Sequence, residues 1–245
     1  MTKLSVNLNK IALLRNSRGR DFPNVLDFAQ RFIDLGIHGI TVHPRQDERH
    51  ITMQDTVDLG KLLATNKNVE FNVEGYPSSE FLELIEKVKP TQCTLVPDSP
   101  EQLTSDHGWN LSKDGGFVKQ KCDYLSSLGI RTAIFLDPDI EQIKLSVKTK
   151  TNRIELYTET YASSAGSKNH LEIFNKFNRA SIEAQKLGIG INAGHDLDLL
   201  NLPRFLKIQN ILEVSIGHAL TIECIELGMD KVIEKYLDIC KKSNK

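Results

Sequence analysis

The feature that most constrains this chain of 245 residues is a strand-and-helix unit repeated about eight times. Short runs rich in β-branched residues alternate with amphipathic stretches, a pattern that predicts βαβ units and a parallel sheet. The expected strands are Leu4–Asn9, Gly39–His43, Val69–Glu74, Gln92–Val96, Arg131–Leu136, Arg153–Tyr157, Gly188–Ala193 and Ile211–Ile216. The expected helices include Val25–Leu35, Phe117–Leu128, Leu171–Leu187 and Val232–Lys241.

The junctions between these units carry matching signals. Leu-Gly-Ile occurs at residues 35–37, 128–130 and 187–189, each time where a helix gives way to a strand. Glycine suits the left-handed residue just past a helix end, and the β-branched isoleucine then begins the strand. Helix starts are predicted at Thr52, which precedes Asp55 by three residues, and at Ser78 in a Pro-Ser-Ser-Glu segment.

Eight such units in about 250 residues predict a closed (β/α)₈ barrel of the TIM type. We expect parallel strands, additional short helices in the loops, and one domain over residues 1–245. An open doubly wound sheet is the alternative, but the Gly-rich dinucleotide turn expected after its first strand is absent from the sequence.

Composition excludes several classes of protein. Lys and Arg number 31 against 32 Asp and Glu, so no basic excess favours nucleic-acid binding. No apolar run approaches the roughly 20 residues of a membrane helix, and no signal peptide is visible. The four cysteines lie far apart without a CxxC pair, which favours a reducing compartment. We therefore expect a cytoplasmic protein.

Three connections from a strand to the following helix are expected to be long, Lys10–Asn24, Pro97–Gly116 and Thr158–Asn169. All three lie on the C-terminal face, where barrel enzymes build their active sites. Tolerated insertions are the alternative, but the shared location favours function.

The ends of the second and third strands carry candidate acid–base groups. His43 ends the second strand and is followed by Arg45, whose fork of N–H donors suits phosphate or carboxylate. On the third strand, Glu70, Asn72 and Glu74 share one face by period-two alternation, and we expect that polar face to line the lumen. Position along the strand favours Glu74 as the functional carboxylate.

Later strands add to the same end of the barrel. Glu155 lies among apolar neighbours on the sixth strand, and Gly-His pairs end the seventh strand at His195 and the eighth at His218. Glycine-containing turns after these last two strands predict a phosphate site built from backbone N–H groups. The histidines show no compact metal-ligand spacing and no cysteine partner, so we expect no metal.

Taken together, these stretches resemble the pyridoxine 5′-phosphate synthase family. The matches run in order across nearly the whole chain. They are Asn7-Leu-Asn-Lys-Ile-Ala-Leu-Leu-Arg15-Asn-Ser-Arg18-Gly, Gly39-Ile-Thr-Val-His43-Pro-Arg45, Arg49-His50-Ile-Thr, Asn68-Val-Glu70, Leu95-Val-Pro97, Ile154-Glu155, Asn192-Ala-Gly-His195 and Ile216-Gly-His218-Ala.

The resemblance implies condensation of 1-deoxy-D-xylulose 5-phosphate with 3-amino-2-oxopropyl phosphate. The products would be pyridoxine 5′-phosphate, inorganic phosphate and water, formed without a cofactor. It also implies a homo-oligomer, an octamer in this family. The physical chemistry agrees, because an imine must form and a ring must close, and each step moves protons.

Roles follow position by position from the matching motifs. His43 and Glu70 would be acid–base residues, His195 a proton donor and Glu155 a stabiliser of developing charge. The family thus points to Glu70 rather than Glu74. Residues implied to bind the substrates are Asn7, Asn9, Lys10, Arg18, Arg45, His50, Thr104, Asp196, Gly217 and His218.

Two of these positions depart from the family pattern. Asn9-Lys10 stands where many members have Asp-His, and Asp196 stands where a glycine is common. A carboxylate beside a phosphate would repel it unless turned away, so we expect no direct contact from the Asp196 side chain.

Two other functions remain open at this stage. One is a phosphosugar aldolase that forms a Schiff base through Lys10, the one lysine placed at a strand's C-terminal end. The other is a barrel that binds a phosphorylated metabolite without turnover.

Overall fold

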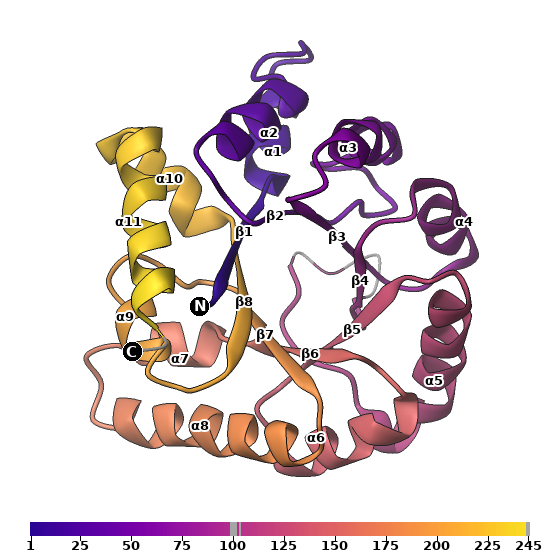
Figure 1. Ribbon diagram of the computed structural model, residues 1–245, viewed down its shortest axis with the longest axis vertical. Helices are drawn as coiled ribbons and strands as arrows, with labels where there is room; N and C mark the ends of the chain where they lie inside the picture. The colour runs from indigo at the N-terminus through magenta and orange to yellow at the C-terminus, as the bar shows by residue number, and fades with distance from the viewer. Residues whose placement is uncertain (99–101, 103, 244–245) are drawn as a thin grey trace.

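The computed structural model describes residues 1–98, 102 and 104–243. Eight parallel strands close into a barrel in sequence order, with β8 hydrogen-bonded to β1 (Figure 1). The predicted (β/α)₈ barrel is therefore confirmed. The strands are β1 (Lys3–Asn7), β2 (Gly39–Val42), β3 (Glu70–Gly75), β4 (Gln92–Leu95), β5 (Arg131–Leu136), β6 (Arg153–Tyr157), β7 (Gly190–Gly194) and β8 (Ile211–Ile216).

Helices surround this ring of strands in Figure 1. They are α1 (Asn9–Asn16), α2 (Val25–Asp34), α3 (Met53–Thr65), α4 (Ser79–Val88), α5 (Leu111–Ser127), α6 (Ile140–Ser146), α7 (Glu159–Ser163), α8 (His170–Lys186), α9 (Leu202–Phe205), α10 (His218–Leu227) and α11 (Met229–Lys242), with a 3₁₀ turn at Val147–Thr149. None of these helices in the described parts of the chain is long and apolar enough to cross a bilayer.

The local signals in the sequence set these elements as predicted. The glycines of the three Leu-Gly-Ile segments, Gly36, Gly129 and Gly188, have φ angles of +85°, +76° and +72°. Thr52 and Asp55 form a capping box at the start of α3, and Ser78 accepts a hydrogen bond from the Phe81 N–H at the start of α4. The predicted strand boundaries agree with the structure to within two residues.

Two of the long connections contain short helices, as predicted for the loops. The segment predicted as Lys10–Asn24 includes α1, and the segment Thr158–Asn169 includes α7. The third connection is shorter than predicted, because α5 begins at Leu111 and not at Phe117. Burial of Leu111, with its N–H bonded to Gln142 at 2.7 Å, outweighs the poor helix propensity of two glycines. Residues 99–101 and 103 of that connection lie outside the described residues.

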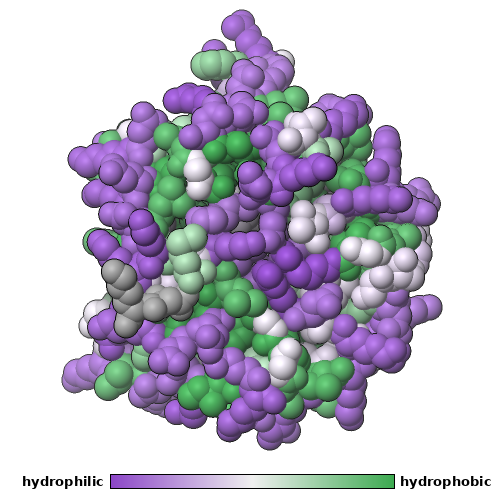
Figure 2. Space-filling model, viewed as in Figure 1, coloured by the Kyte–Doolittle hydropathy of each residue, from purple (hydrophilic) through white to green (hydrophobic). Residues whose placement is uncertain are grey.

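Alternation along the strands separates an apolar layer from a polar lumen. Phe71 and Val73 on β3 belong to the hydrophobic core. Between them, Asn72 points the other way and bonds to Thr41 on β2 and Thr94 on β4, at 3.4 and 2.9 Å. The prediction that the polar face of this strand lines the lumen is confirmed. Hydrophilic residues gather over the middle of the molecule in Figure 2.

Candidate active site

The carboxyl ends of β2 and β3 bring His43 and Glu74 to the same level of the barrel. Val42 and Val73 are paired in the parallel register, and His43 and Glu74 are the residues that follow them. The backbone N–H of His43 donates to the Asn9 side chain at 3.0 Å, so the start of α1 holds this end of β2 in place.

His43 is joined by a second histidine, His50, on the connection to α3. Their ring centroids lie 6.3 Å apart, edge to face. Burial, followed by the charge of Arg45, lowers the pKa of His43 well below its ordinary value. Burial and the same guanidinium lower the pKa of His50 to about 4. Both rings are therefore neutral at neutral pH and can accept a proton.

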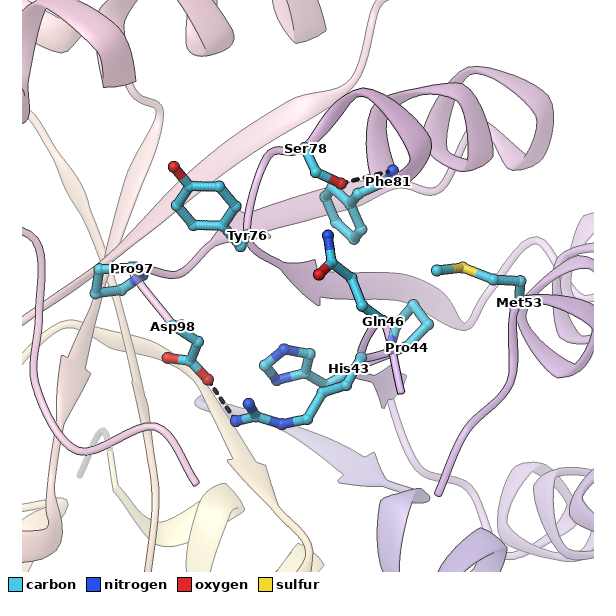
Figure 3. Close-up of a pocket in the computed structure, with 10 residues that line it drawn as sticks. His43, Pro44, Gln46, Met53, Tyr76, Ser78, Phe81, Pro97 and Asp98 are labelled. Atoms are coloured by element: carbon cyan, nitrogen blue, oxygen red, sulfur yellow. Dashed lines mark hydrogen bonds and ion pairs between the residues drawn. The ribbon is translucent and has the colours of Figure 1, made fainter. Parts of the chain in front are cut away.

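A cavity of about 310 Å³ opens beside His43 at the ends of β2, β3 and β4 (Figure 3). Arg45 and Asp98 form an ion pair across its wall, and both are almost fully buried. The second Asp98 oxygen, Oδ1, is buried without a hydrogen-bond partner among the described residues. The lining residues are His43, Pro44, Arg45, Gln46, Met53, Tyr76, Ser78, Phe81, Pro97 and Asp98.

Gln102, Thr104 and Ser105, in the connection after β4, contact residues on two sides of the barrel mouth. Arg45 Nη1 donates to the carbonyl of Gln102 at 3.2 Å, and Ser105 donates to Asp98 at 2.7 Å. Thr104, between them, lies 3.1 Å from His195 Nε2 on the β7 side. The segment therefore contacts both groups of candidate residues.

Three buried carboxyl side chains lie close enough in the lumen to affect one another's pKa. They are Glu74 on β3, Glu155 on β6 and Glu213 on β8. Burial raises the pKa of Glu74 well above its ordinary value, and the neighbouring charges of Glu155 and Asp98 add to this. Burial and the charge of Glu213 raise the pKa of Glu155 to about 8. A carboxyl group that holds its proton at neutral pH can act as an acid.

Gly194 explains how Glu155 fits at this level. A Cβ atom at position 194 would lie 2.4 Å from Glu155 Oε1, so a side chain there would displace the carboxyl group. The glycine of the strand-seven motif therefore serves a close approach to Glu155.

The structure does not bring Glu70 to this end of the barrel. Glu70 is the first residue of β3, and its carboxylate pairs with Lys3 and Arg131, the first residues of β1 and β5. Burial opposes its ionisation, but hydrogen bonds from Arg131 and Lys3 together outweigh burial and lower the pKa to about 2. The role implied for Glu70 by the resemblance therefore has no support in this geometry, whereas Glu74 occupies the expected place.

His195 follows the end of β7 and is held between two polar partners. Its Nδ1 lies 2.9 Å from Asp196 Oδ2, and its Nε2 faces Thr104. The Asp196 carboxylate is turned onto the imidazole.

The turn after β8 lies against the end of β1. Gly217 precedes the first residue of α10, His218, and a Cβ at Gly217 would lie 3.0 Å from the Cβ of Asn7. Because α10 begins directly after β8, its first turn lies at the carboxyl end of the strands, where the sequence predicts a phosphate site. His218 itself is exposed.

Two predicted substrate-binding residues, Arg18 and Lys10, are not among the residues that line the cavity. Arg18 lies in the exposed segment after α1, away from the cavity lining. Lys10 belongs to the first turn of α1, where its charge acts on both His50 and Asp196.

Sequence reasoning missed two residues of this end of the barrel. Asp98, three residues past β4, holds Arg45. Tyr157, the last residue of β6, stands edge-on to the His195 ring at 5.0 Å. A polar residue at a strand's carboxyl end was the available signal for Tyr157. Within the described residues, no three His, Cys, Asp or Glu side chains gather as a metal site requires.

Comparisons with known proteins show the family to which the chain belongs. The family model described as "Pyridoxal phosphate biosynthesis protein PdxJ" matches residues 4–242. A pyridoxine 5′-phosphate synthase of Bacteroides fragilis is 50% identical over 237 residues, which are 96% of this chain and 98% of that protein. One of Porphyromonas gingivalis is 47% identical over 239 residues, covering 97% and 98%.

Solved structures with little sequence identity share the fold. A mutant tryptophan synthase α-subunit of Pyrococcus furiosus has a TM-score of 0.66 at 12% identity, covering 98% of this chain and 97% of that one. Phosphoribosyl anthranilate isomerase of Thermus thermophilus has a TM-score of 0.61 at 10% identity, covering 97% and 100%.

Proposed function

Because the chain belongs to the family of the pyridoxal phosphate biosynthesis protein PdxJ, we propose that it is a pyridoxine 5′-phosphate synthase. The proposed reaction condenses 1-deoxy-D-xylulose 5-phosphate with 3-amino-2-oxopropyl phosphate to pyridoxine 5′-phosphate, with release of phosphate and water. The relatives that carry this activity in their names align with the chain nearly end to end.

The observation that carries the proposal is the set of acid–base groups at one end of one lumen. His43 is neutral and can take a proton, and Glu155, with a pKa of about 8, holds its proton at neutral pH. Burial raises the pKa of Glu74 well above its ordinary value. Imine formation, loss of phosphate and water, and ring closure each need a proton removed at one atom and supplied at another. A barrel that only binds a metabolite would have no use for such opposed groups.

In this proposal His43 and Glu74 exchange protons with the substrates. Glu74 takes the role that the resemblance implied for Glu70, since it stands at the level of His43. Glu155, as a protonated carboxyl, donates a hydrogen bond to negative charge that develops in the transition state. His195 supplies a proton from the β7 side.

Two anionic substrates need cationic or N–H-rich contacts on two sides. Arg45, beside the cavity, supplies a guanidinium, and His50 a neutral imidazole, on the β2 side. Gly217 and the start of α10 supply backbone N–H groups on the β8 side. Gln102, bonded to Arg45, and Thr104, beside His195, join these two sides and help to exclude water from reactive intermediates.

The test is incubation of the purified protein with both substrates. We expect pyridoxine 5′-phosphate, identified by fluorescence and mass spectrometry, together with released phosphate. His43→Asn should lower kcat by about 10²-fold or more, the usual scale for a general acid–base group. His107→Asn, on an exposed histidine, is the matched control and should retain activity. A wild-type protein that forms no product under these conditions contradicts the proposal.

A further inference from the structure

The turn after β7 has an unfavourable backbone conformation at two successive residues. His195 has a φ of +89° and Asp196 a φ of +58°. Residues other than glycine rarely adopt positive φ angles. Hydrogen bonds from both sides hold it: Thr158 Oγ1 donates to the Gly194 carbonyl at 2.7 Å, and Asn201 Nδ2 to the Asp196 carbonyl at 3.0 Å. The fold thus maintains a costly turn that sets the two side chains against each other.

The imidazole of His195 is fixed on three sides as a result. Its Nδ1 lies 2.9 Å from Asp196 Oδ2, and its Nε2 lies 3.1 Å from Thr104 Oγ1. The Tyr157 ring stands against it at 78°, with the centroids 5.0 Å apart. The ring therefore has one orientation, with Nε2 directed to Thr104.

The charges around the pair keep the Asp196 carboxylate ionised. The hydrogen bond from His195 lowers the pKa of Asp196, against the opposing effect of burial, and the charges of His218 and Lys10 lower it further. On the other side of the ring, burial raises the pKa of Tyr157 to about 12, and neighbouring negative charges, Asp196 among them, add to this. An ionised carboxylate only accepts hydrogen bonds, so the proton of a neutral His195 ring sits on Nδ1.

We propose that Asp196 is a positioning residue that fixes the tautomer and orientation of His195. This inference rests on the proposed function, in which His195 donates a proton. The imidazolium releases its Nε2 proton to a leaving oxygen of the substrate and returns to the neutral ring with its proton on Nδ1. Solvent restores the Nε2 proton, since the His195 side chain is 26% exposed. Paired Asp and His side chains work by the same physics in hydrolases.

The test combines nitrogen NMR of the histidine ring with steady-state kinetics. In ¹⁵N-labelled wild-type protein, with His195 assigned by its loss in His195→Gln, the neutral ring should carry its proton on Nδ1. In Asp196→Asn the amide can donate to Nδ1, so we expect the proton to move to Nε2. The same variant should lower kcat by about 10- to 100-fold, because the ring then has the wrong tautomer for returning to its proton-donating state.

Two further variants separate positioning from stability. Asp196→Gly removes the carboxylate but accepts a positive φ without strain, so it should fold and still lose kcat. Asp123→Asn is the control for the loss of one carboxylate, because Asp123 lies on α5 and pairs with Lys119 and Lys150. It should change neither the His195 tautomer nor kcat.

The outcomes distinguish this inference from the proposed function. A wild-type protein that makes no product contradicts the proposed function, while the ring tautomer still reports on the pair. Product formation with an unchanged tautomer in Asp196→Asn overturns the inference. So does a wild-type kcat in either Asp196 variant. A shifted tautomer with a lowered kcat in both supports it.

Discussion

The pKa values of glutamate side chains shift in opposite directions at the two ends of the barrel lumen. At the amino end, Glu70 lies between Lys3 and Arg131, and its pKa falls to about 2. Toward the carboxyl end, Glu74 and Glu155 lack such partners among the described side chains, and burial raises their pKa values. A glutamate is thus permanently ionised at the amino end, whereas at the carboxyl end its pKa is raised and its protonated form is favoured.

This difference gives the two glutamates of one strand different expected roles: Glu70 stabilises the fold and Glu74 takes part in catalysis. Glu70 and Glu74 both belong to β3 and both face the lumen, four residues apart. A carboxylate held by two cations gives up its proton permanently at neutral pH, so it cannot cycle between forms during turnover. A carboxyl poised near neutral pH can do so, and catalysis is therefore expected at the unpaired end.

The largest expected effect on kcat comes from substituting the two glutamates of β3 separately. Glu74→Gln removes an acid–base group and should lower kcat by about 10²-fold or more. Glu70→Gln, the matched change at the paired end, should alter kcat by less than about threefold. Both are measured as the rate of pyridoxine 5′-phosphate formation at saturating substrates. The reverse order of effects would restore Glu70 to the role implied by the family resemblance.

At the amino end, where Glu70 is ion-paired, we expect substitution to change the free energy of unfolding and not kcat. Glu70→Gln is expected to lower the free energy of unfolding by about 2 kcal/mol at neutral pH, because Lys3 and Arg131 lose their shared anion. The folded pKa of Glu70 lies below the unfolded value, so this stabilisation is complete above about pH 4.5 and lost as pH falls toward 2.

Urea unfolding of wild type and Glu70→Gln at several pH values measures this difference. The two curves of unfolding free energy should converge on acidification, since protonation removes the same charge as the substitution. A constant gap down to about pH 2 would mean that the carboxylate charge of Glu70 is not what stabilises the amino end.

The contrast between the two ends also marks what a sequence alone can predict. Alternation placed Glu70, Asn72 and Glu74 on the lumen face, and the Leu-Gly-Ile junctions located the helix ends. Both are local properties of the chain, set by backbone periodicity and by φ preferences.

What could not be predicted depends on partners distant in the chain. Whether Glu70 is paired depends on Lys3 and Arg131, which barrel closure brings to it over 67 and 61 residues. The ion pair of Arg45 with Asp98 spans 53 residues in the same way. A motif match transfers a residue type to a position but carries no information about these long-range contacts.

The smallest expected effect is the pH dependence of the unpaired end. Glu155 has a raised pKa of about 8, so its protonated form predominates below that pH and is lost as pH rises through it. If the protonated carboxyl stabilises developing charge, kcat/KM should fall about tenfold per pH unit above this value. In Glu155→Gln the amide still donates a hydrogen bond but cannot ionise, so its lower activity should stay level across the same range. A wild-type profile that remains level up to about pH 9.5 would show that Glu155 acts in its ionised form, and would remove the distinction between the two ends for this residue.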